Sequence, residues 1–199
     1  QTELVMLTHG FELPANELSE LRKKFGLQDA VVLSASRDVS LGKCLNLCAA
    51  AAGGDVLTKM DDDDCYGPEY LSDQLFALGF SGADIVGKQA HYVHLKQSQA
   101  NIVRYAEKEH RYTDFVMGPT IMAPRQVLME IPFSHLSRGE DTAFLQTAHK
   151  QGMTIYSADR FNYLQVRGGS EHTWQVSDAQ LMASGNLRFY GEPHDHIHI

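Results

Sequence analysis

Apolar segments of strand-like length alternate with amphipathic segments of helical period near the start of the chain. Strands are predicted at 3–9, 30–35 and 55–60, and helices at 13–25 and 41–52 between them. Strands separated by helical segments of roughly 10–15 residues are typical of βαβ units, whose strands lie parallel in one sheet. The sequence therefore predicts an α/β fold in which helices flank a mainly parallel sheet.

The remainder of the chain has more closely spaced elements. Further helices are predicted at 68–78, 124–130 and 141–150, and further strands at 83–90, 113–123, 154–159 and 161–167. Because the last two strands follow one another closely, the sheet is expected to be mixed there. The polar stretch 91–111 carries no assignable pattern. We predict a single domain over residues 1–185, followed by a polar tail at 186–199.

Length, charge and composition exclude several classes of protein. The 199 residues suffice for one domain with a sizeable core, and the formal net charge of −8 argues against a nucleic-acid partner, since an acidic surface repels phosphate backbones. No apolar run reaches the roughly 20 residues that cross a bilayer, so we expect no transmembrane segment. Three cysteines without a CxxC pair favour reduced thiols and a cytoplasmic location. Because the chain starts at Gln1, we expect it to be part of a longer one.

Four consecutive aspartates, Asp61–Asp64, follow the predicted strand at 55–60. In open α/β sheets, ligands bind beyond the carboxyl ends of the strands. Adjacent carboxylates repel one another, and a divalent cation such as Mg²⁺ or Mn²⁺ is the natural counter-charge for oxygen ligands. The alternative is a solvated acidic turn, which the run alone does not exclude.

The segment 59–71, KMDDDDCYGPEYL, resembles the DxD segment of glycosyltransferase family 2, whose members have the GT-A fold. The resemblance implies that Asp63 ligates Mn²⁺ or Mg²⁺ and that Asp61 and Asp62 lie on the donor side of the site. Asp64 is implied to be a supporting carboxylate.

A second acidic pair, Glu140 and Asp141, stands at the start of the predicted helix 141–150. Carboxylates at a helix N-terminus are stabilised by the helix dipole, so a purely structural explanation is available. The run GEDTAFL also resembles the G-E-D-x-x-L element of the same family. That resemblance implies that Asp141 is the general base and that Glu140 supports it or binds the acceptor.

Weaker correspondences involve four further residues. Asn46 matches the asparagine of the helix before the DxD strand, and Gly118 matches a glycine beside the donor sugar. His172 corresponds to a position that completes the metal shell or touches the diphosphate, and Trp174 is assigned to the acceptor side. Each has an ordinary alternative: a surface asparagine, a β-bulge, or polar loop residues.

The family pattern implies a metal-dependent inverting glycosyltransferase of hexosyltransferase type, which moves a sugar from a nucleoside-diphosphate sugar to the hydroxyl of a carbohydrate or other acceptor. The chain departs from the pattern at its start, because strand 3–9 ends in Thr8-His9-Gly10 and not in the family's acidic turn. We therefore expect the first βα unit of the family to be absent. Two alternatives remain: a non-catalytic GT-A-like module of a larger protein, or a metal-dependent nucleotidyltransferase or phosphohydrolase.

Overall fold

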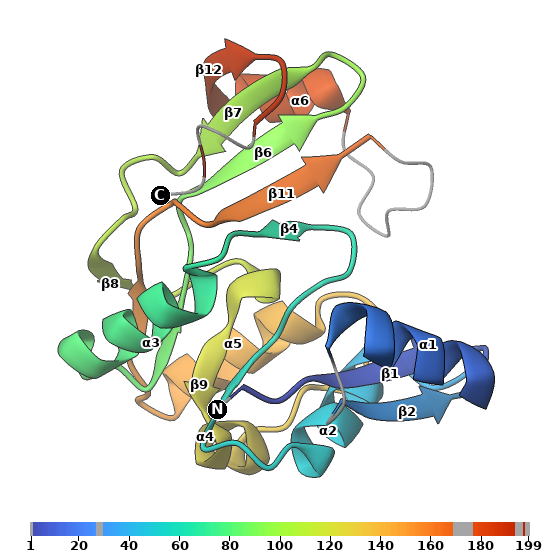
Figure 1. The fold of residues 1–199 in the computed structure, drawn as a ribbon. Helices are drawn as coiled ribbons and strands as arrows, with labels where there is room; N and C mark the ends of the chain where they lie inside the picture. The colour runs from blue at the N-terminus through green and yellow to red at the C-terminus, as the bar shows by residue number, and fades with distance from the viewer. Residues whose placement is uncertain (1, 27–29, 169–176, 194–196, 198–199) are drawn as a thin grey trace. The chain divides into compact units, whose positions relative to one another are not determined.

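A computed structural model describes residues 2–26, 30–168, 177–193 and 197 (Figure 1). In chain order the elements are β1 (Val5–His9), α1 (Ala15–Phe25), β2 (Val31–Ala35), α2 (Leu41–Ala51), β3 (Val56–Thr58), β4 (Cys65–Tyr66), α3 (Tyr70–Ser81), β5 (Ile85–Gly87), β6 (His91–Leu95), β7 (Ala100–Arg104), β8 (Arg111–Thr113), the 3₁₀ helix η1 (Gly118–Thr120), β9 (Met122–Pro124), α4 (Arg125–Glu130), α5 (Glu140–Lys150), β10 (Ile155–Ser157), β11 (Tyr163–Arg167), α6 (Asp178–Ala183) and β12 (Gly185–Tyr190). They group into two compact units. Unit 1 comprises Gln1–Leu57 and Pro124–Thr147, and unit 2 comprises Thr58–Ala123 and Ala148–Ile199.

Unit 1 contains a parallel pair of strands. β1 and β2 pair from Val5 opposite Val31 to His9 opposite Ala35. α2 packs against β1 and also against α4. The parallel β1–α1–β2 order is that of a βαβ unit, as the spacing of apolar segments predicts.

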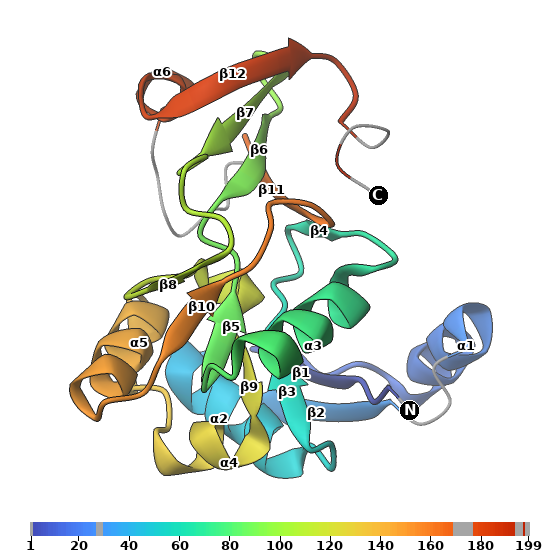
Figure 2. The same ribbon diagram turned by 90° about the vertical axis from the view of Figure 1, so that its left-hand side faces the viewer.

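Unit 2 contains a sheet in the order β12-β7-β6-β11-β4 (Figure 2). β11 runs parallel to β6, whereas β4, β7 and β12 pair antiparallel with their neighbours. Successive side chains of β6 point to opposite faces, because a strand has a period of two. Tyr92 accordingly joins one apolar cluster and Val93 another, the second including Leu181 of α6. The sheet is thus covered on both faces.

A further sheet runs in the order β9-β5-β10-β8, with β3 beside β9. β10 lies parallel to β5 and antiparallel to β8, and α3 packs against β5 and β10. The predicted class, a mixed α/β fold with helices flanking sheets, is confirmed. Antiparallel pairs are more numerous than the sequence indicates, because several connections are too short for a crossover helix.

The predicted strand 113–123 is instead divided among β8, η1 and β9. Pro119 lies within η1, and its ring removes the backbone N–H that a continuous strand ladder needs. The N–H groups of Thr120 and Ile121 bond back to Met117 and Gly118, which closes the turn.

The stretch 91–111, which has no clear pattern in sequence, forms the hairpin β6–β7 and leads into β8. Two of its polar residues, His94 and Asn101, are buried opposite each other in the hairpin. His94 Nδ1 lies 2.9 Å from Asn101 Oδ1, and the Asn101 amide donates to the Gly191 carbonyl. Because these polar groups satisfy one another inside the sheet, the segment looks solvent-exposed in sequence although it is a core hairpin.

Residues 186–190, predicted as the start of a polar tail, form most of β12 and pair with β7. Ser177 and Gln180 make a capping box that starts α6 just before this strand. Of the helices that the structure describes, none is both long and apolar enough to span a bilayer.

Candidate functional site

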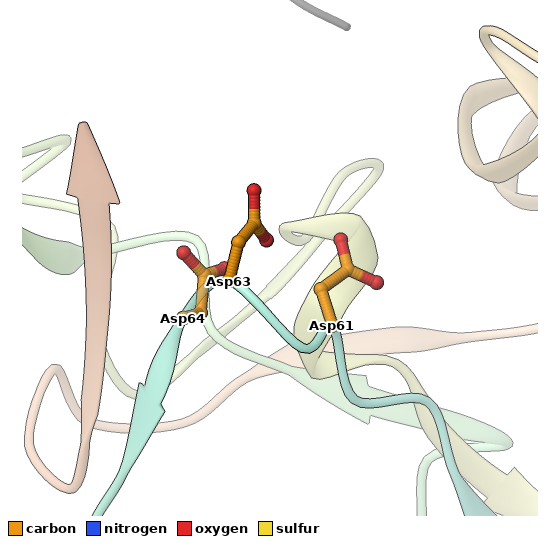
Figure 3. Close-up of side chains that lie close together, drawn as sticks. All are labelled: Asp61, Asp63 and Asp64. Atoms are coloured by element: carbon orange, nitrogen blue, oxygen red, sulfur yellow. The ribbon is translucent and has the colours of Figure 1, made fainter. Parts of the chain in front are cut away.

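The acidic turn, defined here as residues 61–64, connects β3 to β4 in unit 2. Asp61, Asp63 and Asp64 each offer one carboxylate oxygen to a group whose members all lie within 4.8 Å of one another. Figure 3 shows the carboxylates of Asp61 and Asp63 rising from the same side of the turn. Asp62 is exposed. The structure thus brings Asp63 and Asp61 together, while the roles predicted for them, metal ligand and donor contact, stay predictions.

Asp64 is fixed in place by two donors from β11. The Tyr163 hydroxyl donates to Asp64 Oδ2 at 2.7 Å, and the backbone N–H of Val166 donates to Oδ1 at 3.0 Å. Burial raises the pKa of Asp64 to about 6, and the charges of Asp63 and Asp61 act in the same direction, against the two hydrogen bonds. Asp64 therefore holds its negative charge at a cost that a nearby cation would reduce.

Asp61 has a cationic neighbour and a backbone anchor. Lys59 Nζ lies 2.9 Å from Asp61 Oδ1, and the Lys59 side chain is only 6% exposed. The backbone N–H of Asp61 donates to the Tyr66 hydroxyl at 2.8 Å. Lys59 neutralises part of the negative charge of the acidic turn.

Gly118 lies at the start of η1 and is buried. The following carbonyl, that of Pro119, accepts a hydrogen bond of 3.1 Å from the Tyr66 hydroxyl. The same hydroxyl therefore links η1 to the acidic turn at Asp61. This arrangement brings Gly118 near the turn within unit 2, although Gly118 itself stays a predicted donor contact.

The acidic turn satisfies the chemical requirements of a site for a hard divalent cation. All of its side-chain ligand atoms are carboxylate oxygens, the type preferred by Mg²⁺ and Mn²⁺. Mg²⁺ takes only one or two protein carboxylates and completes its coordination with water and substrate phosphate. The residues present therefore fit such an ion, with Asp63 and Asp61 as the groups that face one side of the turn.

The second acidic pair occupies the first turn of α5 in unit 1. Glu140 is 5% exposed, and Asp141 is half-buried. Gly139 precedes them with φ of 82°, a left-handed conformation that glycine adopts without strain. The helix dipole stabilises both carboxylates here. Burial of a glutamate at a helix start nevertheless exceeds what a simple cap requires.

The segment before α5 is attached to α2 by Gly42 and Asn46. A Cβ on Gly42 would lie 1.9 Å from the Ser134 carbonyl oxygen, so only glycine permits this approach. One turn later, the Asn46 side chain accepts from the Phe133 N–H and donates to the Phe133 carbonyl, both at 2.9 Å. Asn46 thus positions the segment that leads to Glu140. Its contact with a donor stays a prediction.

His172 and Trp174 lie outside the described residues, and their assigned roles stay predictions. Sequence reasoning missed the groups that surround the acidic turn, namely Lys59, Tyr66 and Tyr163. Lys59 and Tyr66 flank the run of aspartates and could have been suspected from that position. Tyr163 is far away in sequence and carries no local signal.

No protein-family model matches the sequence, and no curated protein matches it. Solved structures of S. aureus TarS are similar in fold. The first, TarS 1-349 in complex with UDP-GlcNAc, is 16% identical with a TM-score of 0.59, over 88% of this chain and 61% of that chain. TarS 1-349 alone gives a TM-score of 0.57 at 16% identity, over 82% and 60%. The complex of TarS 1-349 with UDP gives 0.54 at 16% identity, over 83% and 60%.

The chain therefore has a GT-A-like fold, as the resemblance to glycosyltransferase family 2 implies. It spans about three fifths of the length of the TarS 1-349 chain in the complex with UDP-GlcNAc. At 16% identity the likeness establishes the fold alone. What the acidic turn and the start of α5 do must be argued from their chemistry.

Proposed function

We propose that this chain is a metal-dependent glycosyltransferase that moves a sugar, with inversion, from a nucleoside-diphosphate sugar to an acceptor hydroxyl. The observation that carries the proposal is the group of carboxylates Asp61, Asp63 and Asp64 on a GT-A-like fold. TarS structures hold UDP-GlcNAc or UDP, which supports a UDP-sugar as the first donor to test. A sugar of the hexose type and a carbohydrate acceptor belong to the same proposal.

The acidic turn supplies the leaving-group side of the reaction. When bound, Mn²⁺ or Mg²⁺ neutralises the charge that develops on the departing diphosphate. Asp63 is the principal ligand, Asp61 faces the donor with it, and Asp64 supports both from its fixed position. Asp62, which is exposed, contributes to the donor side. The proposal also assigns Gly118 and Asn46 to the donor side, and His172 to the metal shell.

The start of α5 supplies the acceptor side. Inverting transfer requires a carboxylate that accepts the proton of the acceptor hydroxyl as its oxygen attacks the anomeric carbon. We assign this role to Asp141, with Glu140 in support and Trp174 contacting the acceptor. General-base assistance of this kind contributes about 10²–10⁴-fold to the rate.

A thermal-shift panel tests the proposal. UDP-, GDP- and TDP-sugars are each added with Mn²⁺, and the melting temperature is compared with that of the protein alone. A ligand present at about 100 times its Kd adds about 2.7 kcal/mol to the free energy of unfolding. We expect a shift with at least one donor in wild type and none in Asp63→Asn.

The matched control is Glu107→Gln, which removes one carboxylate from an exposed position after β7 in the same unit. It should shift as wild type does. The proposal fails if no nucleotide-sugar with Mn²⁺ stabilises the wild-type protein. Product analysis separates the enzymatic alternative. Nucleoside monophosphate and sugar 1-phosphate from the nucleotide-sugar indicate a phosphohydrolase, and pyrophosphate from an added nucleoside triphosphate indicates a nucleotidyltransferase. Free nucleoside diphosphate from the nucleotide-sugar indicates glycosyl transfer.

A further inference from the structure

Two tyrosine hydroxyls contact the acidic turn, one at each end. At the first end, the Tyr66 hydroxyl accepts from the backbone N–H of Asp61 at 2.8 Å and donates to the Pro119 carbonyl at 3.1 Å. At the other end, the Tyr163 hydroxyl donates to Asp64 Oδ2 at 2.7 Å. The backbone and one side chain of the turn are therefore tied to groups outside it.

The two tyrosines form a single rigid unit. Tyr66 of β4 and Tyr163 of β11 are direct antiparallel partners, and their ring centroids lie 5.5 Å apart. Tyr70, which begins α3 and is 1% exposed, packs edge-on against Tyr66 at 4.8 Å. Side chains packed in this way have few rotamers available, so the positions of both hydroxyls are set by the sheet and the helix.

A phenolic hydroxyl is a neutral group that can both donate and accept a hydrogen bond. The Tyr163 hydroxyl therefore donates to Asp64 without adding a further charge to the acidic turn. The Tyr66 hydroxyl accepts from the turn and donates away from it, so it uses both capacities.

We propose that Tyr66 and Tyr163 are positioning residues that hold the acidic turn in its cation-binding shape, an inference that rests on the proposed function. The physical reason is electrostatic: adjacent carboxylates repel one another, and an unsupported loop would separate them before a cation arrives. Groups that orient metal ligands without touching the metal change metal affinity by about 10–100-fold when they are removed.

The two tyrosines have distinct parts in this arrangement. Tyr163, together with the N–H of Val166, uses both oxygens of Asp64 and so fixes the orientation of that carboxylate. Tyr66 fixes the backbone at Asp61 and connects it to η1 through Pro119. Loss of either hydroxyl leaves the ring packing intact but frees one end of the turn.

The test measures Mn²⁺ affinity in the presence of UDP by electron paramagnetic resonance. Tyr163→Phe and Tyr66→Phe each remove one oxygen atom and keep the ring. We expect about 10–100-fold weaker Mn²⁺ binding in each. The matched control is Tyr112→Phe, which loses a hydroxyl bond to the Ser81 carbonyl elsewhere in unit 2 and should bind Mn²⁺ as wild type does.

A second readout separates positioning from general damage to the fold. If the tyrosines act through the metal site, saturating Mn²⁺ restores kcat of both variants to near the wild-type value, and only the Mn²⁺ concentration for half-maximal transfer rises. The inference is overturned if Tyr163→Phe and Tyr66→Phe bind Mn²⁺ as tightly as Tyr112→Phe, or if kcat falls at every Mn²⁺ concentration. Absence of Mn²⁺ binding in the wild type would instead overturn the proposed function itself.

Discussion

The acidic turn of unit 2 and the acidic start of α5 in unit 1 look alike in sequence but differ in how their charge is stabilised. In the turn, Asp61, Asp63 and Asp64 lie within reach of one another, and the charges of Asp63 and Asp61 raise the pKa of Asp64. At the start of α5, Glu140 and Asp141 lie in the first turn of the helix, where the helix dipole stabilises their negative charges.

This difference shows that a cluster of carboxylates indicates a ligand site only when its local structure is known. The helix start provides its own partial positive charge, so acidic residues there are stable without a ligand. In the turn, Lys59 is a cationic partner of Asp61, and the charges of Asp63 and Asp61 raise the pKa of Asp64. A cation bound there, as proposed above, would stabilise the ionised form of Asp64.

The largest expected effect separates the two regions by activity. Asp141→Asn should reduce kcat for sugar transfer by about 10²–10⁴-fold, because the amide cannot accept the acceptor proton. The same variant should keep its thermal shift with Mn²⁺ and nucleotide-sugar, since Asp141 is not among the ligands proposed for the cation. Steady-state kinetics and melting curves on one preparation check both expectations. Transfer at the wild-type rate would place the base elsewhere.

An acidic residue whose partner is a protein cation gives a reference for the comparison. Asp159 lies 3.0 Å from Nζ of Lys88, which is fully buried, and burial lowers the pKa of that lysine. Asp159→Asn should lower the free energy of unfolding by about 3 kcal/mol, at the lower end for a buried pair because the Asp159 side chain is 23% exposed. Urea denaturation measures the loss. Lys88→Met, which removes the buried charge, is the companion variant and should cost less. Equal losses would show that the charge of Lys88 does not matter.

A buried histidine in unit 2 makes its own contribution to the loss of stability at low pH. Measuring that contribution distinguishes it from the contribution of the carboxylates. Burial lowers the pKa of His91 from 6.5 to about 4. Below pH 6.5 the unfolded chain binds a proton that the folded protein does not, so stability falls as the pH drops from 6.5 to 4. The loss is about 1.4 kcal/mol per pH unit within that window. His91→Gln should lack this slope, so the difference in unfolding free energy between the two proteins should change with pH within the window. Parallel curves would contradict the assignment.

The smallest expected effects are changes in stability of opposite sign in the two regions, measured in protein free of metal and nucleotide. Asp63→Asn should raise the urea midpoint slightly, because it relieves repulsion within the acidic turn. Asp141→Asn should lower the free energy of unfolding by about 0.3–1 kcal/mol, because it removes a charge that the helix dipole stabilises. Changes of the same sign in both variants would show that the two regions do not differ in the way described.

The sequence carries enough information for the fold class and most element positions, because apolar periodicity reports directly on burial. β1, α2 and α5 begin or end within two residues of their predicted limits. The hairpin β6–β7 was not predicted, because its buried polar residues His94 and Asn101 make the segment resemble an exposed one in sequence. In the structure these two side chains contact each other. β12 was missed for a related reason, as most of its residues are exposed although they are paired.

The candidate site was predictable to a smaller degree. A run of four aspartates at the end of a strand is visible without a structure, and so is an acidic pair before a helical pattern. The pairing of β4 with β11, which brings Tyr163 to Asp64, depends on a contact between residues 99 positions apart. No local pattern encodes such a contact. The supporting groups of a site are consequently harder to infer than its charged members.

The close approach of α2 to the Ser134 carbonyl has a consequence for sequence variation. Since a side chain at position 42 would overlap backbone, the contact cannot be relieved by a change of rotamer. Any replacement of Gly42 must move the segment that ends at Glu140. A change in α2 would therefore displace the start of α5. The glycine and the asparagine four positions later therefore join α2 to the segment before α5 at two successive points, so that neither piece of chain can shift without the other.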